Sequence, residues 1–223
     1  MSSKVQSITT VAVFPLPNVV FFPKTLLPLH IFEPRYRKMT EDALAGSNQI
    51  VVTLLKDGWE QDYFGNPDVH EIACVGEIQY SEKLDNEKFN ILLYGISRVK
   101  IVDFIQEAPY RIADVQLIKD TNIDHDSFNE KLESENFMAL LDRYLFEMGI
   151  TLDRPNLTGH SFEAVINQTA SILDLTTREK QELLEIGVVE MRYDKLKTIL
   201  SKKLLALKIT KNIKFVPEDP NWN

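Results

Sequence analysis

The sequence predicts an α+β protein, in which a small curled β-sheet or open barrel is followed by a bundle of helices. Over residues 8–118 the apolar residues come in short runs with strand-like spacing, and turn residues separate these runs. Near residue 120 the spacing changes to that of amphipathic helices. The chain, at 223 residues, is long enough to bury a substantial core. We therefore expect a β-subdomain over 1–120, a helical bundle over 121–207 and a C-terminal tail over 208–223.

The β half is expected to hold five or six mostly antiparallel strands. Pro28 lies inside the second segment and favours an edge position or a bulge, because proline has no N–H for a ladder bond. Residues 84–87, with the sequence LDNE, favour a hairpin turn. Leu92 and Tyr94 give the following strand apolar residues on both of its faces. The expected strand segments are 8–16, 25–32, 48–56, 70–83, 88–107 and 110–120.

One helix interrupts the strands, over residues 34–45. Pro34 suits its first turn, where the missing N–H would be unpaired anyway. Gly46 suits its end. Glu33 is placed to cap the start of this helix.

The C-terminal half is expected to hold several helices. Ser127 with Glu130 offers a capping box for the first of them, and Thr176 with Glu179 offers another for a short helix. Apolar residues recur at helical spacing through the rest of this half. The expected helices span 128–145, 162–173, 177–185 and 189–207.

The composition excludes several classes of protein. The net charge of −8 and the absence of a dense Lys/Arg stripe disfavour nucleic-acid binding, which depends on neutralising phosphates. No apolar run approaches the ~20 residues of a membrane-spanning helix, and the N-terminus has no signal-peptide pattern. The single cysteine, Cys74, rules out an internal disulfide and a cysteine zinc cluster, so we expect a reducing, cytoplasmic setting and no cofactor or metal.

Motifs for catalysis are weak. The sequence has no glycine-rich phosphate-binding loop. HEIAC, at 70–74, resembles a zinc-protease motif, but that motif needs a helix and this segment has the pattern of a strand. Ser97 and Lys100 match S-x-x-K, but residues three apart in a strand point to opposite faces. The DHD sequence at 124–126 directly precedes a predicted helix, where acidic residues favour the helix dipole.

The segment 14–44 carries a resemblance to a known family. FPLPNVVFFPKTLLPLHIFEPRYRKMTEDAL resembles the opening signature of the N-terminal domain of Lon ATP-dependent proteases. VGEIQ at 75–79 and FNILLYGISRVKI at 89–101 agree with later family blocks in order. LTTREKQELLEIGVVEMRYDKLKTIL, at 175–200, resembles the family's helical subdomain.

The resemblance implies a PUA-like β pseudo-barrel, a helical bundle and a role in recognising protein substrates. It also implies a scaffold role, rather than one in an active site, for the residues that match family positions at the barrel edge and its helix: Pro23, Pro28, Ile31, Phe32, Glu33, Arg35 and Tyr36. The sequence contains neither ATP-binding motifs nor a Ser–Lys protease domain. We therefore expect a non-catalytic protein that binds proteins or peptides, in partnership with a separate ATPase or protease. The sequence leaves open the identity of the client, whether a separate ATPase partner exists, and the oligomeric state.

Aromatic residues supply the candidate binding residues. Trp59, Tyr63 and Phe64 interrupt the polar loop 57–69, and aromatics in loops are common binding anchors. Phe21 and Phe22, between two prolines, are a second candidate. The alternative is that these rings fold back onto the barrel.

Two further functions stay open from the sequence. A small peptidase or hydrolase would require a nucleophile and base, for which Ser97 and His30 are the residues to test. RNA binding would fit a PUA-like barrel, and the negative net charge counts against it.

Overall fold

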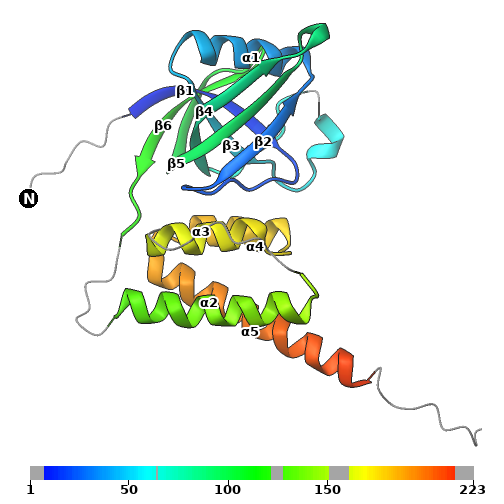
Figure 1. Ribbon diagram of the computed structural model, residues 1–223. Helices are drawn as coiled ribbons and strands as arrows, with labels where there is room; N and C mark the ends of the chain where they lie inside the picture. Colours follow the sequence, from blue (N-terminus) through cyan, green and yellow to red (C-terminus); the bar gives the residue numbers. More distant parts are fainter. Residues whose placement is uncertain (1–7, 64, 122–127, 151–160, 214–223) are drawn as a thin grey trace, which may run out of the picture.

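Six strands form one curled sheet above a bundle of helices in the computed structural model, which describes residues 8–63, 65–121, 128–150 and 161–213 (Figure 1). The predicted α+β class is thereby confirmed. The strands are β1 (Ile8–Leu16), β2 (Leu26–Ile31), β3 (Gln49–Leu54), β4 (Ile72–Lys83), β5 (Phe89–Gln106) and β6 (Arg111–Ile118). Short 3₁₀ turns, η1 (Trp59–Asp62) and η2 (Asp85–Glu87), follow β3 and β4.

The strand order is β2-β5-β4-β3-β1-β6, and β6 pairs again with β5. Strands β5, β4, β3, β1 and β6 therefore close into a barrel, while β2 extends from one end of β5 as an edge strand. Only β1 and β3 run parallel among these pairs. The β4–β5 connection through η2 confirms the predicted hairpin, with Lys83 paired to Phe89. Pro28 lies in edge strand β2, as its missing N–H requires.

Helix α1 (Pro34–Ala45) has the predicted bounds and packs its buried face, including Tyr36 and Met39, against the sheet. Gly46 is its C-cap, as expected. Glu33 occupies the N-cap position, but its side chain makes no cap hydrogen bond. The predicted capping role is therefore wrong, because the Glu33 carboxylate is bound by two other side chains described below.

Four helices form the bundle. Asn129, rather than Ser127, is the N-cap of the first helix, since its side chain accepts a hydrogen bond from the N–H of Leu132. The Thr176–Glu179 capping box is present as predicted. The last helix runs past the expected boundary at residue 207. The helices are α2 (Glu130–Glu147), α3 (Phe162–Ile172), α4 (Thr177–Glu185) and α5 (Val189–Ile213).

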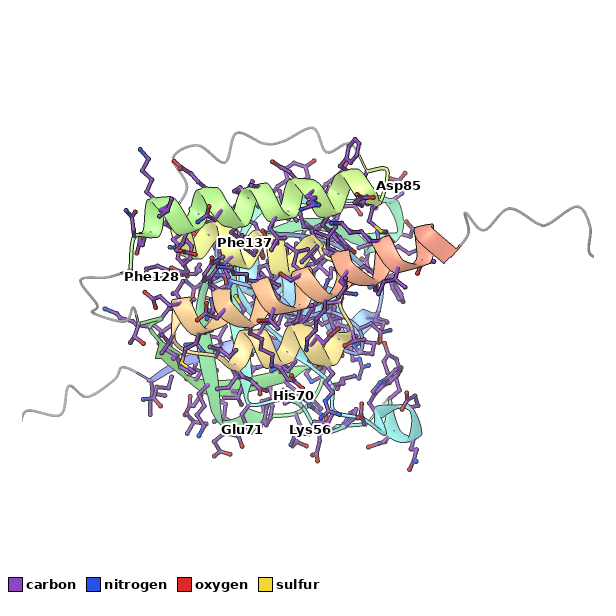
Figure 2. All side chains as sticks on the ribbon, turned by 90° about the horizontal axis from the view of Figure 1, so that it is seen from below. Lys56, His70, Glu71, Asp85, Phe128 and Phe137 are labelled. Carbon is purple, nitrogen blue, oxygen red and sulfur yellow. The ribbon has the colours of Figure 1, made fainter. Side chains whose placement is uncertain are left out.

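Three apolar clusters build the core. One fills the barrel with small and β-branched residues, one lies between α1 and the sheet, and one fills the bundle. Phe137 lies in the bundle core, between the helices seen in Figure 2. Phe21 belongs to the cluster beneath α1, whereas its neighbour Phe22 belongs to the bundle cluster. The segment between β1 and β2 thus contributes one ring to each side and ties barrel to bundle.

A buried ionic network completes this junction. Asp120, just after β6, lies 2.5 Å from the Arg98 Nε of β5 and 2.9 Å from the Arg192 Nη2 of α5. Arg98 also donates to the carbonyl of Leu184, at 3.2 Å. Arg192 donates to the carbonyls of Leu183 and Ile186, at 3.1 and 2.6 Å. The two guanidiniums therefore satisfy carbonyl groups at the C-terminus of α4, where cations are favoured.

Candidate functional site

Phe21 and Phe22 do not form a binding surface. Their exposed fractions are 2% and 0%. The expectation that they are surface anchors is therefore corrected: a client cannot reach either ring without opening a core. Two glycines make this burial possible. A Cβ at residue 76 would lie 2.6 Å from the Phe21 ring, and a Cβ at residue 95 would lie 2.2 Å from the carbonyl oxygen of Phe22.

Trp59 and Tyr63 lie at η1, and both are half-buried. Their rings meet edge to face, with centroids 5.5 Å apart. Trp59 also packs against the apolar core of the barrel. The two rings therefore fold partly back onto the barrel and keep part of their surface accessible. Phe64, the third candidate in this loop, lies outside the described residues.

The Glu33 carboxylate holds the loop after η1. Tyr63 Oη donates to Glu33 Oε1 at 2.8 Å, and Arg35 Nε donates to Glu33 Oε2 at 3.0 Å. Arg35 Nη2 further donates to the carbonyl of Tyr63, at 3.3 Å. Burial and the neighbouring Glu33 carboxylate raise the pKa of Tyr63. This cluster fixes the start of α1 against the 57–69 loop, a structural role.

The weak catalytic motifs are not assembled. The hydroxyl of Ser97 lies 3.2 Å from the carbonyl oxygens of Arg98 and Ile118, while Lys100 pairs with Glu71 at 3.4 Å. Segment 72–74 is part of β4, so His70 and Cys74 do not share a helical face. Burial raises the pKa of the Cys74 thiol well above its ordinary value. Within the described residues, no three His, Cys, Asp or Glu side chains are arranged to hold a metal ion.

One face of the sheet exposes a continuous set of apolar side chains. In the register of β2, β5 and β4, Pro28 lies beside Leu92, which lies beside Tyr80, and Leu26 lies beside Tyr94. Tyr80 is 56% exposed, Leu26 59% and Tyr94 40%. Side chains alternate between faces along a strand, and the β5 residues next to Leu92, Ile91 and Leu93, are accordingly buried in the core. We call these five residues, Leu26, Pro28, Tyr80, Leu92 and Tyr94, the outer sheet face.

A row of polar side chains borders the outer sheet face. His30 Nδ1 lies 2.8 Å from Asn90 Oδ1, and Asn90 Nδ2 donates to Glu82 Oε2 at 3.2 Å. These three residues are cross-strand neighbours. The His30 ring also stacks on Phe32, with centroids 6.2 Å apart. His30 therefore belongs to a cross-strand network on three strands, with Asn90 and Phe32 as its partners.

The binding residues expected from the sequence did not include the outer sheet face. One signal was present, because Leu92 and Tyr94 give β5 apolar residues on its second face. Their exposure depends on whether another layer covers them, and the strand alone does not decide this. Their neighbours on the outer sheet face, Leu26 and Pro28 of β2 and Tyr80 of β4, follow only from the pairing register of the strands.

A cleft lies between the barrel and helix α4 of the bundle. This cleft has a volume of about 540 Å³. Its barrel side includes Asp57, Trp59 and Glu60 of the 57–69 loop, together with His70, and its other side is one face of α4. Figure 2, which looks onto the bundle, shows His70 beside this helix. Among the four of the expected binding aromatics that the structure describes, Trp59 is the one that lines this cleft.

Hydrogen bonds cross the floor of the cleft. Gln181 of α4 donates to the carbonyl of Ile72, at 2.9 Å, and to Glu185, at 3.0 Å. His70 Nδ1 lies 3.3 Å from Glu185 Oε1. The barrel and α4 are thus linked by polar contacts of residues that line the cleft.

No helix in the described part of the chain combines the length and apolar composition needed to span a membrane.

Comparisons with known proteins agree with this architecture. The family model for the ATP-dependent protease La (LON) substrate-binding domain matches residues 10–202. A Lon protease of Desulfosudis oleivorans is 26% identical over 208 residues, which cover 90% of this chain and 25% of that protein. A Lon protease of Flavobacterium johnsoniae is 28% identical over 192 residues, covering 81% of this chain and 22% of that protein. The chain therefore spans about a quarter of the length of these relatives.

Two solved structures share the fold. The N-terminal domain of a Mycobacterium avium complex Lon protease has a TM-score of 0.67 at 16% identity, covering 86% of this chain and 98% of that one. A Lon N-terminal domain protein from Xanthomonas campestris has a TM-score of 0.59 at 20% identity, covering 85% and 97%. The matched part is the substrate-binding domain, and the family model does not include the ATPase or protease domains. The chain belongs to the family of ATP-dependent protease La (LON) substrate-binding domains.

Proposed function

We propose that this protein binds exposed segments of client proteins and acts without chemistry of its own, as a recognition module for proteolysis by a separate ATP-dependent protease. The outer sheet face carries the proposal. Two tyrosines, a leucine and a proline are exposed there side by side, and exposed apolar clusters of this kind mark interaction sites. Tyrosine combines a large apolar area with a polar hydroxyl and is enriched at binding hot spots.

Contact through side chains fits this face better than addition of a strand. The free edge of the sheet is β2, and Pro28 in its middle has no N–H to offer an incoming strand. A continuous backbone ladder along β2 is therefore interrupted. We expect clients to be held mainly by burial of their apolar side chains.

The family supports a role in recognising protein substrates, because the matched domain is the substrate-binding domain of an ATP-dependent protease. A cytoplasmic location belongs to the same proposal. The hydrolase alternative gains no support from a specific observation, because Ser97 and His30 lie in separate hydrogen-bonded settings.

The binding test uses a permanently unfolded client, reduced and carboxymethylated α-lactalbumin carrying a fluorescent label. The double variant Tyr80→Ser/Tyr94→Ser should bind this client at least about tenfold more weakly in fluorescence anisotropy. Leu205→Ser/Ile209→Ser is the matched control, since these α5 residues are also exposed, at 60% and 52%. Equal loss in both variants, or no loss in the tyrosine variant, would contradict the proposal.

The link to proteolysis is tested separately. Purified protein is used to capture partners from lysate, and retained proteins are identified by mass spectrometry. Retention of an ATP-dependent protease by the wild type supports the link. Retention of clients without such a protease would restrict the function to client binding.

A further inference from the structure

We propose that the cleft between the barrel and α4 binds a lysine or arginine side chain carried by an extended segment of a client. This inference rests on the proposed client binding and adds the class of side chain that a second site selects. The cleft and the outer sheet face use different residues, so each is testable without altering the other.

The charges of the cleft favour a cation. Its lining includes four carboxylates, from Asp57, Glu60, Glu182 and Glu185, against one guanidinium, from Arg178. The α4 carboxylates already have partners. Glu182 pairs with Arg178 at 3.2 Å and with Lys195 at 2.7 Å, and Glu185 contacts His70 and Gln181.

Asp57 and Glu60 differ from Glu182 and Glu185 in their partners. Both are exposed, and within the described residues neither makes a hydrogen bond or an ion pair. They flank Trp59 in the sequence Asp57–Gly58–Trp59–Glu60. Gly58 adopts φ +92°, a left-handed conformation that glycine permits at no steric cost, and both carboxylates line the same cleft as the indole.

Trp59 adds an aromatic surface for the same ligand. In the described residues, cations lie over the rings of Tyr36, Tyr63, Phe89, Phe104 and Tyr193. No such cation lies over Trp59 in that part of the chain, although indole is the ring that attracts cations most strongly. A lysine stem or guanidinium on the half-exposed indole would complete the site, with its charge between Asp57 and Glu60.

The size of the cleft suits more than a single ion. Its volume of about 540 Å³ falls within the range of ligand pockets, about 300–1,000 Å³. Leu54, Leu55 and Pro17 contribute apolar surface to the same wall. A long basic side chain with neighbouring residues of an extended segment matches this combination of apolar wall and acidic rim.

The test compares two labelled peptides by fluorescence anisotropy. One carries lysines among leucines and serines, and the other has glutamine at each lysine. The wild type should bind the lysine peptide about tenfold more tightly than the glutamine peptide at low salt. Asp57→Asn/Glu60→Gln should abolish this preference, and Trp59→Leu should reduce it.

The matched control is Asp85→Asn/Glu87→Gln, which changes the net charge equally on the β4–β5 hairpin. Figure 2 shows Asp85 in the upper part of the view and His70 in the lower part. The control should keep the lysine preference. A preference that persists in the cleft variant, or that falls equally in the control, would overturn the inference.

The outcomes separate this inference from the proposed function. If the wild type binds both peptides equally and Tyr80→Ser/Tyr94→Ser weakens both, client binding stands and the cationic site fails. If the wild type binds neither peptide nor the unfolded client, both fail.

Discussion

The barrel and the bundle meet along two sides that differ in chemistry. On the closed side, Phe22 enters the bundle core and Asp120 lies between two buried guanidiniums, those of Arg98 and Arg192. On the open side, the cleft holds the half-buried Trp59 and the exposed carboxylates of Asp57 and Glu60, which have no partner among the residues that the structure describes.

The difference separates a structural role, on the closed side, from the ligand-binding role that we propose for the open side. Buried charges are costly unless opposite charges and hydrogen bonds compensate them, and on the closed side they have such partners. The closed side therefore fixes the position of α4. Exposed carboxylates need no internal partner because water solvates them, so the charge that we propose for ligand binding on the open side carries little cost in stability.

Arg192→Ala should break the closed side and give the largest effect. The variant leaves the carbonyls of Leu183 and Ile186 without their donor and Asp120 with a single cation. We expect a loss of about 3–5 kcal/mol in the free energy of unfolding, the usual result of removing one partner from a buried network. Urea unfolding followed by circular dichroism measures it.

The control for this prediction is Arg178→Ala, on the open side. The Arg178 side chain is 89% exposed, and its loss should change stability by no more than about 0.5 kcal/mol. Similar effects for the two arginines would remove the distinction between the sides.

Gly95→Ala tests the closed side through the backbone. A Cβ at residue 95 would lie 2.2 Å from the carbonyl oxygen of Phe22, so the segment that carries this ring into the bundle must shift. We expect a loss of about 1–3 kcal/mol, as for other overpacked sites. A melting temperature equal to that of the wild type would show that the segment moves freely.

Trp59→Ala tests the open side and should cost about 1 kcal/mol. One part of the indole packs against the barrel core, and the rest lines the cleft. A fully buried tryptophan would cost about 3–5 kcal/mol on truncation. Thermal unfolding of this variant, measured beside Gly95→Ala, decides whether Trp59 is a partly exposed cleft residue or a core residue. A loss of about 3–5 kcal/mol in the free energy of unfolding would make it a core residue.

The smallest effect concerns acid stability within the bundle. The Tyr193 hydroxyl donates to Glu133, and Lys197 pairs with it, which lowers the pKa of Glu133 below its ordinary value of 4.5. A carboxylate with a lowered folded pKa stabilises the fold above its unfolded pKa and loses that contribution as the pH falls through the folded pKa. Glu133→Gln should therefore lower the melting temperature at neutral pH by about 1–2 °C.

The pH dependence is the control for this substitution. The difference in melting temperature between wild type and Glu133→Gln should shrink as the pH falls below 4.5. A difference that stays constant with pH would show that packing, rather than charge, explains the effect of the substitution.

Local sequence signals determined most of the elements. The change of apolar spacing near residue 120 separates strands from helices, and Pro34 and Gly46 bound α1 as predicted. The Thr176–Glu179 capping box and the hairpin at 84–87 also follow the sequence. These signals are reliable because each depends on interactions within one or two turns of chain.

The site depended on tertiary structure. Sequence placed Phe21 and Phe22 beside each other, and only packing decided that each enters a different core. The sequence made Trp59 a candidate binding residue because of its place in the 57–69 loop. Helix α4, which forms the opposite wall of the cleft, lies more than a hundred residues later in the chain, so the cleft itself was not predictable.

What the sequence by itself determined, then, is the order and kind of the elements and the resemblance to the Lon family. Only the fold decided that Arg98, Asp120 and Arg192 form one network and that Tyr80 and Tyr94 share an exposed face. The physical reason is that periodicity and capping act between neighbours in the chain. Burial and charge pairing act between whichever surfaces close packing brings together.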